Sequence, residues 1–81
     1  MALKSHQLRM ARALLRWSIA DLAERSGVAI STIKRAEAVE GELPITRPNA
    51  DALQRALEVA GAEFIAENGG GAGVRMRKSE T

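Results

Sequence analysis

The chain has 81 residues, which is enough for one domain and too few for two. It contains no cysteine, which excludes a disulfide framework and thiolate metal sites. No apolar run approaches the roughly 20 residues of a membrane-spanning helix, and the first ten residues lack the apolar segment of a secretory signal. We therefore expect a cytoplasmic protein.

The net charge of +2 is distributed unevenly along the chain. Residues 1–35 carry seven basic and two acidic side chains, whereas residues 36–67 carry two basic and seven acidic ones. A basic half beside an acidic half favours one face that meets a polyanion such as nucleic acid. Charge by itself leaves open the alternative of ordinary solvated helix faces.

Two helices are predicted in the first third of the chain. Apolar residues recur every three or four positions over residues 5–15, which predicts a helix with Ser5 as its N-cap. A second helix is predicted over residues 18–26. Ser18 is its expected cap, and Asp21 stands three residues later, as in a capping box.

Gly27 interrupts this helical stretch, where a glycine costs about 1 kcal/mol relative to alanine. It can adopt the left-handed conformation that ends a helix, so we expect a turn rather than a continuous helix. A third helix follows over residues 29–38. After a loop, a fourth helix is predicted over residues 47–60, capped by Thr46.

The last part of the sequence changes character. "AEFIAE" and "GVRMRK" each alternate between apolar and charged residues, and "NGGGAG" lies between them. This pattern predicts a β-hairpin extension and disordered tail over residues 62–81, which follows a helical domain over residues 1–61. Phe64, Val74 and Met76 are expected to pack on the fourth helix. The fold class expected is mainly α, with four helices and a C-terminal two-stranded hairpin.

A short helix, a tight turn and a second helix at a steep angle form a helix-turn-helix. The residue types around Gly27 suit that unit. Ala23 is small where the two helices must approach closely, and Val28 and Ile33 can fill the corner between them.

The segment over residues 8–41 resembles the phage-repressor/Cro type of helix-turn-helix transcriptional regulator. The tail is similar to the extension on many short bacterial members. Ile19 and Ala29 depart from the family pattern, which often has glutamine and serine or threonine there. The matching positions are Arg12, Ser18, Ala23, Gly27, Val28, Ile33 and Glu37.

The resemblance implies a four-helix, repressor-like DNA-binding domain whose third helix enters the major groove. An ion pair between Arg12 and Glu37 is implied as a structural link, and Ala23, Gly27, Val28 and Ile33 are assigned to structure. The side chains expected at base edges are Ala29, Ile30, Ser31, Thr32 and Arg35. Those expected at phosphates are Arg9, Ser18 and Lys34.

We therefore expect sequence-specific binding of double-stranded DNA by a transcriptional regulator, acting as a repressor and as a homodimer through the hairpin. No enzyme activity, metal or cofactor is expected, because His6 is the sole histidine and no catalytic constellation stands out. The alternative is an antitoxin-like or adaptor protein that binds a protein partner and binds DNA weakly or not at all.

Overall fold

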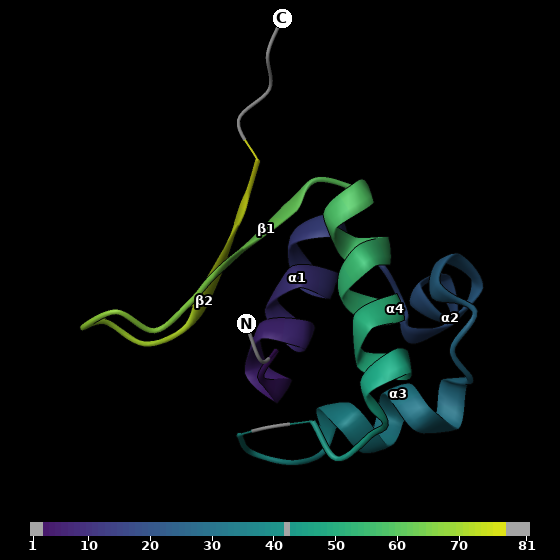
Figure 1. Cartoon of the computed structure of the whole chain (residues 1–81). Coiled ribbons are helices and arrows are strands. Elements are labelled where there is room, and N and C mark those ends of the chain that lie inside the picture. Colours follow the sequence, from purple (N-terminus) through teal and green to yellow (C-terminus); the bar gives the residue numbers. More distant parts are fainter. Residues whose placement is uncertain (1–2, 42, 78–81) are drawn as a thin grey trace, which may run out of the picture.

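The computed structural model describes residues 3–41 and 43–77. Four helices are followed by a two-stranded antiparallel sheet, which confirms a mainly α fold with a C-terminal hairpin (Figure 1). The predicted disordered tail, from residue 78 on, lies outside the described residues. No helix in the described ranges has the length and apolarity needed to cross a bilayer. The elements are α1 (Ser5–Leu15), α2 (Ile19–Ser26), α3 (Ile30–Glu37), α4 (Arg47–Val59), β1 (Ala62–Ile65) and β2 (Gly73–Met76).

The helix starts show which caps the sequence specified. The predicted capping box of α2 is confirmed, because the Ser18 hydroxyl accepts from the Asp21 amide and the Asp21 carboxylate accepts from the Ser18 amide. Ser5 as the N-cap of α1 is wrong: Lys4 holds that position, and its amide donates to Gln7 Oε1 at 2.9 Å. Ser5 is instead buried.

The hydroxyl of Ser5 donates to the carbonyl of Ala36, in α3. The Ser5 side chain therefore forms a tertiary hydrogen bond instead of the local capping bond that the sequence predicted.

The core lies where the four helices meet, and each contributes small or branched apolar side chains. α1 faces α3, while α2 lies against α4, so every helix buries one stripe. The inward side of the hairpin adds Ala62 to this core, with Phe64 and Val74 packed at its edge. The fully buried apolar side chains are Leu8, Ala11, Leu22, Ile33, Ala36, Leu53 and Leu57.

The hairpin lies mainly along α1, and β1 also contacts α4. Packing on the fourth helix alone, as the sequence predicted, is therefore incomplete. Met76 pairs with Ala62, so it shares the inward face of the hairpin as predicted, but it is 45% exposed at the end of the sheet. Ala62 fills the buried place at that end of the hairpin, and the Met76 methyl lies over Gly61.

Two side chains of α1 fasten the hairpin. Gln7 is fully buried, and its amide nitrogen donates to the carbonyls of Ile65 and Gly73 at 3.1 and 3.0 Å. The His6 ring nitrogen lies 2.9 Å from the carbonyl of Ala72. Sequence analysis missed these links, although a glutamine among the apolar residues of a helix is a signal that a buried polar partner exists.

Candidate nucleic-acid interface

The turn between α2 and α3 consists of residues 27–29. Gly27 has φ 75° and ψ 7°, the predicted left-handed conformation, and its amide donates to Ala23 at 2.9 Å. The Ser26 hydroxyl accepts from the Val28 amide at 3.1 Å and donates to the Leu22 carbonyl at 2.7 Å. Val28 is buried in the corner between the helices. Local hydrogen bonds and one apolar anchor therefore fix the direction in which α3 leaves the turn.

α3 has one buried stripe and one exposed face. Ile33 and Ala36 are buried, whereas the predicted base-edge residue Thr32 is half-buried at the border between the two faces. Ile30 is 44% exposed, so an apolar side chain lies on the solvent-facing side of the helix. The exposed predicted residues share one face, because they recur at helical spacing: Ala29, Ile30, Ser31, Lys34 and Arg35.

The polar side chains on this exposed face have no hydrogen-bond or ion-pair partner among the described residues. Within the described residues, Ser31, Lys34 and Arg35 make no side-chain hydrogen bond or ion pair. Ala29 is the N-cap of α3 and offers no side-chain acceptor to the amides of the first turn. With respect to the described residues, the face therefore presents two unpaired cations, a hydroxyl, the sec-butyl side chain of Ile30 and the amides at the start of α3 to the solvent.

The end of α3 is tied to α1 by the ion pair that the resemblance implied. Arg12 Nε and a second guanidinium nitrogen each lie 2.8 Å from a Glu37 carboxylate oxygen, and the third nitrogen donates to the Trp17 carbonyl at 2.9 Å. The two side chains are 23% and 9% exposed. The hydrogen bonds to Glu37 raise the pKa of Arg12 above its usual value despite the opposing effect of burial.

Arg9 lies at the same end of α3. Its guanidinium donates to the Glu37 carbonyl at 2.6 Å and to the Ser5 hydroxyl at 3.2 Å. A cation at a helix C-terminus is favourable, because the last carbonyls carry partial negative charge. Arg9, which the sequence predicted as a phosphate contact, is therefore bonded within the protein, and the sequence did not reveal these bonds.

Ser18 is exposed at the start of α2, as a phosphate contact requires. Its amide donates to the Asp21 carboxylate, and its hydroxyl accepts from the Asp21 amide. The hydrogen bond from the Ser18 amide is the largest cause of the lowered pKa of the Asp21 carboxyl. The start of α2 therefore carries a stable negative charge, which opposes a phosphate. In the described ranges, by contrast, no carboxylate forms an ion pair with Lys34.

The sequence matches no model of a known protein family, and a search of curated proteins finds no significant match.

Proposed function

We propose that this chain binds double-stranded DNA sequence-specifically, with α3 in the major groove, and acts as a transcriptional regulator of the repressor type. The observation that carries the proposal is the exposed, uncommitted face of α3 on a helix held at both ends. Its start is fixed by the Gly27 turn, and its end by the ion pair between Arg12 and Glu37.

The residue types on the face suit direct readout of bases. The Arg35 guanidinium can donate two parallel hydrogen bonds to guanine, the Ser31 hydroxyl can bond a base edge, and Ile30 can pack on a thymine methyl. Lys34, as a point charge, suits a phosphate. α3 runs along the lower edge of the molecule in Figure 1, and the hairpin lies to the side, so the edge is open to a duplex.

A homodimer would complete this function, because one short helix reads few base pairs. The side chains of Met10, Leu14 and Met76 are exposed on α1 and the end of β2, near Val74. The hairpin also carries both charge signs. An apolar surface with both signs can pair with its own copy, as a two-fold interface requires.

The dimensions of the protomer support this arrangement. Its two longer extents are 35 and 30 Å. Two protomers of these dimensions could place their copies of α3 about one DNA turn apart, roughly 34 Å, which is the spacing that a palindromic site requires. Both copies of α3 could then lie at the same edge of the dimer.

The test is a gel-shift titration on a site selected from random duplexes. Arg35→Ala should weaken binding to the selected site by roughly 5- to 150-fold, equivalent to about 1–3 kcal/mol, and relax preference at one base pair. Lys34→Ala should weaken selected and random duplexes alike. Arg55→Ala removes an exposed cation from α4 and serves as the matched control.

Equal binding by wild type, Arg35→Ala and Lys34→Ala would exclude the docking. Absence of salt-dependent binding to any duplex would leave the adaptor alternative, because a DNA-binding protein releases counterions and loses affinity as salt rises. For the dimer, Leu14→Glu should convert a sedimenting dimer to monomer at tens of micromolar chain. A wild-type monomer under those conditions would contradict it.

A further inference from the structure

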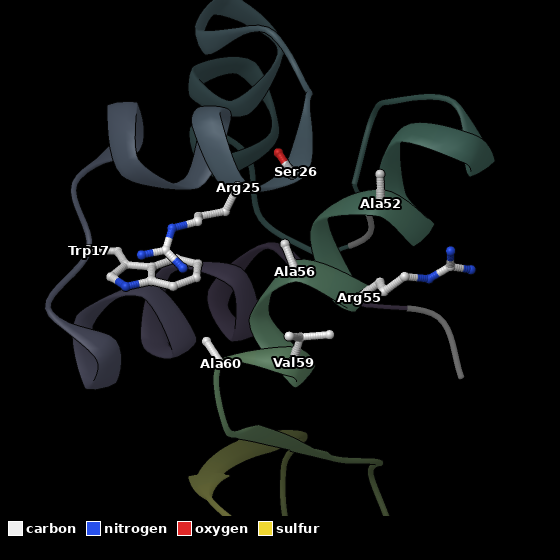
Figure 2. A pocket seen from close by; sticks show the side chains of 8 residues that line it. All are labelled: Trp17, Arg25, Ser26, Ala52, Arg55, Ala56, Val59 and Ala60. Carbon is white, nitrogen blue, oxygen red and sulfur yellow. The ribbon is translucent and has the colours of Figure 1, made fainter.

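A groove of about 390 Å³ runs between α2 and α4, on a surface that the proposed DNA contact does not use (Figure 2). Its floor is a row of three alanines: Ala52 and Ala56 on α4, and Ala60 at the C-cap of that helix. Trp17 and Arg25 form one wall, as Figure 2 shows. From Ala52 to Ala60 the floor extends over eight residue steps, which is about 12 Å at a rise of 1.5 Å per residue.

The two charged side chains that line this groove are basic, and the carboxylate of Asp21, outside the lining, interacts electrostatically with one of them, Arg25. The Arg25 guanidinium lies 5.2 Å from the centroid of the Trp17 ring, and Arg55 stands on the opposite rim. No acidic side chain is among the lining residues in the described part of the chain. Asp51 and Glu58 are neighbours of Arg55 on α4, but neither forms an ion pair with it.

The apolar side of the groove is also unpaired. Val59 lies at its rim and is 78% exposed, although it belongs to a helix with a well-buried opposite stripe. The small floor residues allow a partner backbone or side chain to approach α4 closely. The site therefore combines an apolar floor, an indole wall and two guanidinium groups.

We propose that this groove binds an acidic segment of a partner protein, with an apolar side chain on the alanine floor and carboxylates at Arg25 and Arg55. The charge complementarity selects this occupant. A second copy that packed the same groove against this one about a two-fold axis would bring its own Arg25 and Arg55 to the site, which like-charge repulsion opposes. The groove is open along its length, which suits a segment better than an enclosed small molecule.

The groove lies along the middle and last turns of α4 and beside the end of α2, whereas the proposed DNA-reading face lies on α3. The groove includes the last turns of α4, which lead into β1, whereas α3 lies near the other end of that helix (Figure 1). A duplex on α3 would therefore leave the groove accessible. The inference goes beyond the proposed function and does not depend on it, because binding of a segment can be measured without DNA.

Trp17 is the one tryptophan in the chain, so its fluorescence reports directly on the groove. The probe is a synthetic peptide with two leucines flanked on each side by two glutamates, titrated into the full chain. We expect a saturable change in Trp17 emission. The matched peptide with glutamines in place of glutamates should bind at least about tenfold more weakly, because it loses the charge-assisted hydrogen bonds.

Two variants test the location without disturbing the core. Arg55→Gln removes one cation, and Val59→Glu places a carboxylate at an exposed rim position. Each should weaken the acidic peptide several-fold, whereas Arg77→Gln, outside the groove, should leave its affinity unchanged. Thermal melts check that all three variants fold like the wild type.

Several results would overturn the proposal. They are no saturable change at millimolar peptide, equal binding of the glutamine peptide, and unchanged affinity in both groove variants. If N-acetyl-leucine binds as tightly as the peptide, the groove is a small-molecule site instead. If random duplex DNA displaces the peptide, the groove belongs to a nucleic-acid surface.

Discussion

The α2–α3 unit and the β1–β2 hairpin each consist of two short elements joined by a glycine-containing connection, yet they are stabilised in different ways. The α2–α3 turn closes on itself, through the Gly27 amide, the Ser26 hydroxyl and the buried Val28. The hairpin depends on a distant helix, because Gln7 of α1 bonds the carbonyls at the ends of both strands.

The hairpin has one ion pair of its own, which does not replace these links. Arg75 and Glu63 face each other across the strands at 2.6 Å, but both are exposed, and such pairs contribute about 0–1 kcal/mol. An isolated two-stranded hairpin is marginally stable in water. The comparison teaches that α3 follows a turn that is fixed locally. The hairpin is held to the helices by the apolar packing of Ala62, Phe64 and Val74 and by hydrogen bonds from α1.

The largest expected effect comes from the ion pair that links the end of α3 to α1. Arg12→Met should lower the free energy of unfolding by about 2–3 kcal/mol, less than for a fully buried pair because Arg12 is 23% exposed. It leaves the Glu37 carboxylate, which is 9% exposed, without its partner. Urea unfolding followed by circular dichroism gives the value.

The matched control for this change is Arg12→Met combined with Glu37→Met. The double variant should be more stable than Arg12→Met alone, because no uncompensated carboxylate remains. If the double variant is the less stable of the two, the ion pair is not what ties α3 to α1.

Gln7→Leu should break the hairpin side of the comparison and leave the helices folded. Two strand carbonyls lose their donor, and the Lys4 amide loses its acceptor, at a cost of about 2 kcal/mol. Hydrogen exchange of the amides in β1 and β2 should accelerate far more than that in α2 and α3. His6→Ala removes a single contact to the hairpin, and His6 is less buried than Gln7. This variant should therefore show the same pattern more weakly. Uniform acceleration throughout the chain would mean that the hairpin and helices unfold as one unit.

Gly27→Val tests the local side of the comparison. No atom lies within 4 Å of a Cβ added at Gly27, so the cost comes from the positive φ alone and is roughly 1–2 kcal/mol. Gly27→Asn should cost less, since asparagine tolerates the left-handed region. Thermal melts of the three proteins decide the order. Equal midpoints for the valine and asparagine variants would show that backbone conformation does not limit this turn.

The smallest effect concerns the cap of α2. The pKa of Asp21 is lowered from 3.8, mainly by the hydrogen bond from the Ser18 amide, so folding favours the charged form. This contribution is present above pH 3.8 and is lost as the pH falls through the lowered value. Wild type should melt slightly above Asp21→Asn at neutral pH, and the gap should close in acid. A gap that persists at the lowest pH would exclude the carboxylate as its source.

Features governed by neighbouring residues were predictable from the sequence. The Ser18–Asp21 capping box, the left-handed Gly27 and the Thr46 cap each depend on fewer than five consecutive residues, and the apolar spacing set the four helices. The sequence also supplied the candidate face of α3, because the buried Ile33 fixes which side of that helix is exposed.

Tertiary structure decided the features that join residues far apart in the chain. Ser5 does not cap α1, because its hydroxyl donates to a carbonyl of α3. Arg9 donates to a carbonyl at the end of the same helix, and Gln7 links α1 to the hairpin. The groove beside Trp17 likewise exists only because α2 packs on α4. Local propensity does not predict such contacts. Each buried polar group forms a hydrogen bond with a donor or acceptor that lies next to it in the folded chain, and the packing of whole helices determines which group that is.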